Sequence, residues 1–239
     1  MARTSSSSLK TLPPAERIPL ILEKLGRTTR RPVHARRMSP LDSLMLTVLS
    51  QNTTDANSGR AFERLKARFP TWQDVLKARP QQIADTIRSG GLAEIKSGRM
   101  KQILGRIEQD QGRLDLSLLR RMSVAEVREY LLSLPGVGRK TAAVVMLFSL
   151  GMPTFPVDTH VLRVSRRLGL IPPRTTMDQA HDLFDQMLKT EQMLDLHLGL
   201  IRHGRTVCIA RRPRCPICVL LDLCPQVGVT ATSANGGRQ

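Results

Sequence analysis

The chain is poor in aromatic and in acidic side chains. Only 3% of its 239 residues are aromatic, namely one Trp, one Tyr and five Phe. Proteins that hold single-stranded nucleic acid stack its bases on such rings, so this scarcity disfavours a single-strand binder. The 20 Asp and Glu residues are outnumbered by 37 Lys and Arg residues, which gives a formal net charge of +17. This imbalance indicates a polyanionic partner, duplex nucleic acid before a membrane surface.

Long apolar segments are absent as well. The longest apolar stretch, residues 141–152, is too short to span a bilayer. The N-terminus reads Met1-Ala2-Arg3-Thr4 followed by four serines, without the apolar core of a secretory signal. We therefore expect a cytoplasmic, nucleoid-associated monomer with no membrane partner.

Cysteine is absent from the first 207 residues and then occurs four times within 17 residues. In a reducing compartment such a cluster is more typical of metal ligands than of disulfides. Four thiolates suit either zinc or an iron–sulfur cluster, and the spacing alone does not choose between them. Unligated thiols are the remaining alternative. The candidate ligands are Cys208, Cys215, Cys218 and Cys224.

No stretch alternates with period two over a useful length, so the sequence predicts an all-α fold. Helix starts are marked by Ser39-Pro40 and by a capping box over 123–126. Residues 1–12 and 227–239 lack periodicity and are predicted to be disordered tails. Apolar spacing and caps predict helices over 18–25, 41–49, 61–69, 95–107, 123–133, 139–150, 159–168, 176–190 and 193–205, with short ones from 71 and 80.

The most informative segment is Leu134–Ala142, between two predicted helices. Pro135 fixes φ, while Gly136 and Gly138 permit positive φ and a close approach of the backbone to a ligand. Amide groups at the start of the second helix could then hold a phosphate. An ordinary turn between helices is the alternative. However, a positive charge such as that of Lys140 just inside a helix N-terminus is unfavourable by about 0.3–1 kcal/mol, because the helix dipole is positive at that end. This cost indicates a functional reason for the lysine.

Two more blocks follow this hairpin in order, Val157–Val161 (Val-Asp-Thr-His-Val) and His203–Arg205, which leads into the cysteines. With weaker blocks at 50–55 and 90–96, the chain resembles the endonuclease III family of the helix-hairpin-helix DNA glycosylase superfamily over roughly residues 14–226. The resemblance implies a two-lobed fold. A six-helix barrel over 41–152 would carry the hairpin, and residues 13–40 and 153–226 would form an iron–sulfur domain.

The resemblance also implies an activity. In this family a lysine amine attacks C1′ of the flipped nucleotide, the base leaves, a Schiff base forms, and β-elimination nicks the strand. Lys140 matches that nucleophile, and Asp158 matches the carboxylate that stabilises positive charge on the sugar. Taken alone, Lys140 could be a solvated surface charge and Asp158 only a helix cap.

We therefore expect a bifunctional DNA glycosylase and abasic-site lyase of base excision repair, acting on oxidised pyrimidines in duplex DNA, with a [4Fe-4S] cluster on the four cysteines. One alternative is a monofunctional glycosylase for mispaired adenine, or for thymine or uracil opposite guanine. Such relatives generally lack the hairpin lysine. The other is a non-catalytic DNA-binding module, which would have no need of Asp158.

An enzyme that acts on a base within a duplex must flip it out. In the family a Gln fills the gap and an apolar residue wedges the opposite strand. Alignment on Thr54-Asp55 gives Asn52 at the filling position, with Gln51 one residue earlier, and the wedge maps to Leu92. The family often has Tyr where this chain has Ala93. Further DNA contacts are expected from Leu134, Gly136, Gly138, Arg139, His160, Arg211, Arg212 and Arg214.

Basic residues concentrate in three places near these motifs. Segment 1–38 holds nine Lys and Arg, and segment 202–214 holds five Arg and no acidic residue. Three further arginines follow Asp158, at positions 163, 166 and 167. We expect these regions to grip duplex phosphates in a salt-sensitive way.

Overall fold

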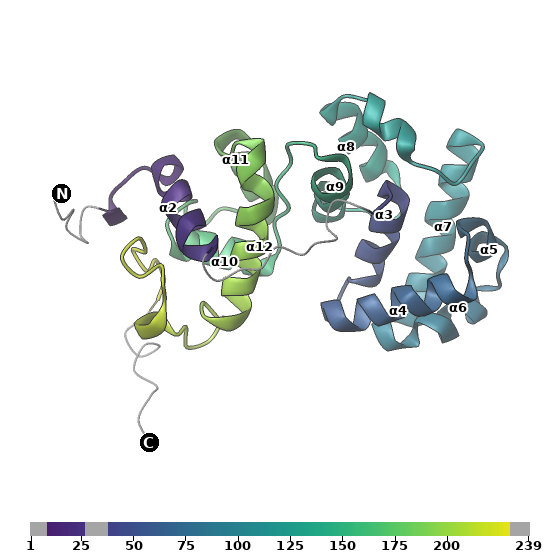
Figure 1. The fold of residues 1–239 in the computed structure, drawn as a ribbon, viewed down its shortest axis with the longest axis horizontal. Helices are drawn as coiled ribbons and strands as arrows, with labels where there is room; N and C mark the ends of the chain where they lie inside the picture. The colour runs from purple at the N-terminus through teal and green to yellow at the C-terminus, as the bar shows by residue number, and fades with distance from the viewer. Residues whose placement is uncertain (1–8, 27–37, 230–239) are drawn as a thin grey trace, which may run out of the picture. The chain divides into compact units, whose positions relative to one another are not determined.

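The computed structural model describes residues 9–26 and 38–229, and the regular structure of this part is helical throughout (Figure 1). The predicted all-α fold is therefore confirmed. The chain divides into two compact units, residues 34–152 and residues 1–33 with 153–239. We call the first the hairpin unit and the second the cysteine unit.

The hairpin unit begins with α3, whose predicted N-cap Ser39 accepts a hydrogen bond from the Asp42 amide at 3.0 Å. Within the unit α6 packs on α7, α3 on α9, and α4 on α6. Its elements are α3 (Pro40–Leu49), α4 (Asp55–Arg68), α5 (Trp72–Lys77), α6 (Pro80–Ile87), η1 (Arg88–Gly90), α7 (Ala93–Gln111), η2 (Ser117–Arg121), α8 (Val124–Ser133), α9 (Arg139–Val145) and η3 (Met146–Leu150).

A single apolar core runs through the hairpin unit. The long helix α7 supplies Met100, Ile103, Leu104 and Ile107, all fully buried, at the spacing of one helix face. Helices α3, α4, α6 and α8 contribute further large apolar side chains to this core. The core fixes the helix ends from which the loops of interest project.

One predicted helix differs in its second half. Residues 139–150 were expected to be one α-helix, but only α9 is α-helical and η3 is a π-helical turn. The turn ends at Gly151, whose φ of 69° ends the helix, and the Met152 amide reaches back to the Met146 carbonyl at 2.9 Å. A wider turn of this kind accommodates one extra residue before a helix stops.

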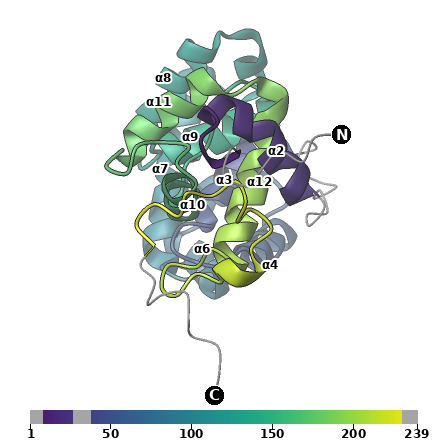
Figure 2. The same cartoon turned by 90° about the vertical axis from the view of Figure 1, so that its left-hand side faces the viewer.

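The cysteine unit contains α2 (Pro14–Gly26), α10 (Thr159–Arg167), α11 (Met177–Met187), α12 (Thr190–Thr206) and the 3₁₀ turn η4 (Cys215–Ile217). Helices α2 and α10 both pack on α12 (Figure 2). Gly199 permits the close approach of α2, since a Cβ atom there would lie 3.0 Å from Leu25 Cδ1. Residues 207–229 form the loop that carries the cysteines, and only η4 is regular in it.

Part of each predicted tail lies within the described residues. Residues 1–8 and 230–239 lie outside them, whereas Leu9 and Lys10 are helical. The Val227 amide donates to the Arg167 carbonyl at 3.1 Å. Over the described part of the chain, the helices are too short or too polar to cross a membrane.

Candidate active site

The hairpin is a tight turn that requires glycine. Leu134 ends α8, and its carbonyl accepts a hydrogen bond from the Val137 amide at 3.1 Å. Gly136 has a φ of 69°, and a Cβ atom there would lie 2.2 Å from Nε of Arg99. The positive φ therefore disfavours any other residue at this position, and a Cβ atom there would also require the Arg99 side chain to move. Leu134 is only 2% exposed, so its side chain is not available for the predicted DNA contact and only its backbone could make it.

Lys140 is the second residue of α9 and is exposed. Gly138, also exposed, is the N-cap residue, so the first amides of the helix have no capping side chain. Thr141, Ala142 and Ala143 are buried and anchor the helix behind the lysine. The primary amine of Lys140 and the first amides of α9 therefore lie close together on a helix that is anchored by buried residues.

Asp158 lies in the cysteine unit as the N-cap of α10. Its Oδ1 accepts a hydrogen bond from the Val161 amide at 2.8 Å, and the side chain is half-buried. The capping role that the sequence offered as an alternative is thus present. It fixes the side-chain conformation.

The extended segment before Asp158 is held by side chains of α11 and α12. The Phe155 amide donates to Asp185 Oδ1 at 2.6 Å. The carbonyls of Phe155 and Pro156 lie 2.9 Å from Nδ1 of His181 and 2.9 Å from Nδ1 of His197. Since a carbonyl only accepts, each buried histidine is the donor. These contacts satisfy backbone groups of a segment that has no strand neighbour.

The candidates for gap filling and wedging lie on two short loops of the hairpin unit. Asn52 has a φ of 54° and Leu92 a φ of 49°, and both are exposed. Few L residues other than Asn and Asp adopt this left-handed conformation, and a leucine there is uncommon. Gln51 accepts a hydrogen bond from Arg99 Nη1 at 3.1 Å, so its side chain is held against the protein.

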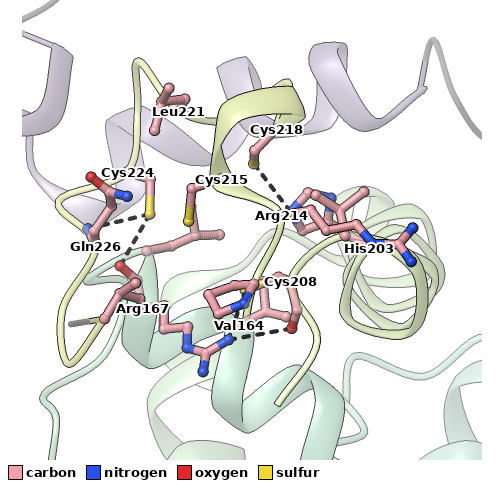
Figure 3. Close-up of a pocket in the computed structure, with 14 residues that line it drawn as sticks. Val164, Arg167, His203, Cys208, Arg214, Cys215, Cys218, Leu221, Cys224 and Gln226 are labelled. Atoms are coloured by element: carbon pink, nitrogen blue, oxygen red, sulfur yellow. Dashed lines mark hydrogen bonds between the residues drawn. The ribbon is translucent and has the colours of Figure 1, made fainter. Parts of the chain in front are cut away.

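All four cysteines line one cavity of the cysteine unit, whose walls include Val164, Leu168, Pro213 and Leu221 (Figure 3). Some of the sulfurs have N–H donors. The Gln226 amide lies 3.3 Å from Cys224 Sγ, and Arg167 Nη1 lies 3.5 Å from Cys208 Sγ. Within the described residues, no three His, Cys, Asp or Glu side chains converge on one point as a single metal ion would require.

Burial shifts the pKa values of side chains that line this cavity. It raises the pKa of the Cys218 thiol to about 11 and raises the pKa of Cys224 as well. It lowers the pKa of His203, whose Nε2 lies 3.5 Å from Cys218 Sγ, to about 4. Without a cationic group the thiol at 218 is therefore neutral. Four thiols around an apolar cavity, with N–H donors to some of the sulfurs, fit a thiolate-bound metal centre.

The three arginines that follow Asp158, for which phosphate contacts were predicted, donate to backbone carbonyls within the cysteine unit. Arg163 and Arg167 direct their guanidinium groups at backbone carbonyls around the start of the cysteine loop, with the shortest contact at 2.7 Å. Arg166 likewise donates to the Thr175 carbonyl. The carbonyls that Arg163 and Arg167 contact are those of Thr159, Gly204, Cys208, Ile209 and Ala210.

A third arginine holds the same loop from α2. Arg17 is 3% exposed and donates to the carbonyls of Leu168 (2.5 Å), Gly169 (2.7 Å) and Leu223 (3.2 Å). Burial lowers the pKa of its guanidinium. The side chain thus joins the end of α10 to the end of the cysteine loop.

The arginines between the first two cysteines face solvent instead. Arg211, Arg212 and Arg214 are exposed around the buried Pro213. His160 lies half-buried with Nδ1 3.1 Å from Arg163 Nη2, and Arg139 is half-buried at the start of α9. Of the basic segment 1–38, residues 1–8 and 27–37 lie outside the described part of the chain.

The contacts of Arg17, Lys96 and Arg99 were not predicted from the sequence. Arg17 precedes Ile21 by four residues and Lys96 precedes Met100 by four, so each basic residue lies on the buried face of its helix. A charged residue in an apolar stripe was the available signal. For Arg99, which is half-buried, the sequence offers none.

Comparisons with known proteins identify the family. A family model described as "HhH-GPD superfamily base excision DNA repair protein" matches residues 45–189. Endonuclease III of Thermotoga maritima is 33% identical over 207 residues, which cover 85% of this chain and 92% of that protein. An Arabidopsis thaliana protein described as a candidate DNA glycosylase is 40% identical over 194 residues, or 80% of this chain and 66% of that longer protein.

Solved structures agree as well. A non-covalent endonuclease III–DNA complex superposes with a TM-score of 0.76 at 30% identity, over 89% of this chain and 95% of the other. A trapped endonuclease III–DNA covalent intermediate gives a TM-score of 0.73 at 30% identity, over 89% and 96%. The chain therefore belongs to the endonuclease III family of the HhH-GPD superfamily of base excision DNA repair proteins.

Proposed function

We propose that the protein, by its family a base excision repair DNA glycosylase, is bifunctional and also cleaves the strand at the resulting abasic site. The observation that carries this proposal is Lys140, an exposed amine on the second residue of α9 directly after the glycine turn. A monofunctional enzyme needs no amine there. The solved relative trapped as a covalent DNA intermediate supports an enzyme–DNA bond in this fold.

In the proposed reaction, Nζ of Lys140 attacks C1′ of the extruded nucleotide and the C1′–N bond to the base breaks. The departing base takes up a proton, the attached amine loses one, and the C1′–O4′ bond of the sugar opens to give a protonated Schiff base. This Schiff base makes the C2′ proton acidic, and loss of that proton breaks the C3′–O bond and expels the 3′ phosphate by β-elimination. Asp158, fixed by its cap to Val161, stabilises the positive charge that develops on the sugar. Oxidised pyrimidines in duplex DNA are the proposed substrates and the nucleoid the proposed place of action, both from the family resemblance.

The proposed grip on DNA uses backbone and side chains. Helix-start amides after Gly136 and Gly138 bind a phosphate, as such termini favour anions. Asn52 fills the gap left by the flipped nucleotide, because it is exposed whereas Gln51 is tied to Arg99. Leu92 wedges the opposite strand. Additional proposed contacts come from Arg139, His160, Arg211, Arg212 and Arg214.

We also propose that Cys208, Cys215, Cys218 and Cys224 hold a [4Fe-4S] cluster. All four cysteines line one cavity of the cysteine unit, and the family resemblance matches each of them to a cluster ligand. When bound, the cluster cross-links the loop and supplies the positive charge that keeps its ligands as thiolates. Iron and sulfide at four atoms each per chain, with a brown colour, would support this, and a colourless protein with one zinc would refute it.

The catalytic proposal is tested by borohydride trapping on a duplex with a single oxidised pyrimidine. Lys140→Gln is expected to abolish the trapped complex and strand cleavage while DNA affinity stays within about twofold, because the amine is the bond-forming group. Asp158→Asn is expected to slow base release by about 10²–10⁴-fold. A trapped complex with Lys140→Gln would show that another residue is the nucleophile.

A further inference from the structure

A buried lysine lies beneath the two loops that carry Asn52 and Leu92. Lys96, on α7, is 2% exposed. Its Nζ donates to the Leu49 carbonyl at 2.6 Å and to the Gly90 carbonyl at 2.8 Å. Leu49 is the last residue of α3 and Gly90 the last of η1. One ammonium group therefore joins the starts of both loops.

Both loops hold a side chain outward in a conformation that L residues rarely adopt. Asn52 has a φ of 54°, and Leu92 a φ of 49° with ψ 42° and 49% of its surface exposed. Such residues persist only where the surrounding structure imposes the conformation. Two of them on neighbouring loops, tied from below by the same buried group, indicate that the structure imposes their presentation jointly.

A second lysine of the same helix provides a comparison. Lys101, five residues after Lys96, donates its Nζ protons to the carbonyls of Leu76 and Ala78 at the end of α5. Helix α7 thus has two lysines that act in the same way, since each donates hydrogen bonds to two backbone carbonyls of other segments. Only the carbonyls bound by Lys96 precede exposed residues with positive φ.

Helix α7 also reaches the hairpin. One turn after Lys96, Arg99 donates to Gln51 at 3.1 Å, and its side chain lies against Gly136. The first half of α7 therefore contacts all three loops of the hairpin unit that the proposed function places on DNA.

We infer that Lys96 is a positioning residue that holds Asn52 and Leu92 in one rigid arrangement, so that both side chains enter the duplex together. This inference rests on the proposed function, which assigns those two residues to gap filling and wedging. Lys96 does not touch DNA in this arrangement. It acts by fixing the ends of α3 and η1, and its loss would let each loop relax separately.

The test compares Lys96→Met with Lys101→Met, which removes an equivalent ammonium from the same helix. The first substrate is a duplex with one paired oxidised pyrimidine, which must be extruded. The second is an abasic site opposite a one-nucleotide gap, which has neither a damaged base to extrude nor an opposite base to displace. Lys96→Met is expected to slow single-turnover base release about 30-fold and to change abasic cleavage less than about threefold, since loop misplacement impairs opening alone.

Lys101→Met should change both rates by a common factor, because it alters stability without moving the two loops. Equal factors on the two substrates for Lys96→Met would overturn the inference. Failure of the proposed function is a separate result, since wild-type protein would then release no base and cleave no abasic site. Fluorescence of 2-aminopurine opposite an abasic analogue reports strand opening independently of any chemistry, and Lys96→Met should reduce it where Lys101→Met does not.

A milder variant covers the case in which Lys96→Met does not fold. Lys96→Gln removes the charge but keeps a side-chain NH₂ group that can donate, and it is combined with Leu92→Ala in a double-mutant cycle. If Lys96 acts through Leu92, the Leu92→Ala substitution slows base release less in the Lys96→Gln background than in the wild type. Effects that simply multiply would overturn the inference.

Discussion

The two units hold their functional loops by different physical means. In the hairpin unit, loops project from helices that share one apolar core, and the ammonium group of the buried Lys96 joins two of these loops from below. In the cysteine unit, the loop 207–229 has almost no regular structure and is held by arginine side chains that bind its carbonyls. Helices satisfy their own carbonyls, whereas an irregular segment needs external donors.

The difference explains why a strongly basic chain does not offer all of its charge to DNA. A guanidinium carries five N–H groups, which suits it to bind several carbonyls at once. Arg17 and Arg167 are used in this way, while Arg211, Arg212 and Arg214 face solvent. Charge counts in the sequence cannot distinguish the two uses, since they depend on what surrounds each side chain.

The largest effect is expected from removing a buried arginine of the cysteine unit. Arg17→Met leaves three carbonyls without their donor and should lower the free energy of unfolding by about 2–4 kcal/mol. Lys24→Met is the control, since Lys24 lies on the same helix and reaches the same loop through a surface pair with Asp222 at 3.0 Å. Such pairs contribute about 1 kcal/mol or less.

Urea unfolding gives both free energies, and hydrogen exchange of the amides in 207–229 localises the change. Arg17→Met should accelerate exchange in this loop and leave the amides of α7 unaffected. If both variants lose the same stability, the loop is held by its apolar contacts and the contrast between the units disappears.

The exposed arginines should affect DNA affinity and leave stability unchanged. Arg211, Arg212 and Arg214 are replaced by Gln. The slope of log K for DNA binding against log salt concentration is then expected to become less steep by about 2–3, since each lost phosphate contact accounts for about 0.9. Stability should stay within about 0.5 kcal/mol. The matched control removes three exposed arginines of the hairpin unit, Arg113, Arg120 and Arg121. A similar change of slope in the control would mean that only net charge matters.

The smallest effect on stability is expected in the hairpin unit, at Leu92. Leu92→Gly relieves a left-handed leucine and should raise the free energy of unfolding by about 0.5–1 kcal/mol. The same variant should impair base release from a fully paired duplex, because the wedge is lost. Thermal melting and single-turnover kinetics measure the two effects.

Leu118→Gly serves as the control for that variant. Leu118 is 46% exposed in η2 and its φ is not positive. Leu118→Gly should therefore lower the free energy of unfolding of the protein by about 0.5–1 kcal/mol. A loss of stability with Leu92→Gly would show that the leucine side chain contributes more by packing than its backbone conformation costs.

Local signals predicted most of the helices correctly. The Ser39 cap and the Ser123 capping box both start helices where expected, because a cap acts over three or four residues. The glycine turn was also predictable, although the clash of a Cβ atom at Gly136 with Arg99 was not. The π-turn η3 carries no local signal and was predicted as ordinary helix.

The contacts that hold the candidate site join residues far apart in the chain, and these could not be predicted. Lys96 binds a carbonyl 47 residues away, and Arg17 one 151 residues away. Likewise, only the structure shows that Gln51 is held by Arg99 and that Arg163 is turned toward backbone. No spacing rule covers such pairs.

The sequence by itself determined the helical class, the turn that exposes Lys140, the grouping of four cysteines and, through ordered motifs, the family resemblance. Those features depend on residues close together in the chain, where propensity, capping and glycine geometry act. Tertiary structure decided which basic residues are buried as ties and which are exposed, and it set the outward conformations of Asn52 and Leu92. Burial and positive φ are imposed by neighbours from distant segments, so they exist only in the folded molecule.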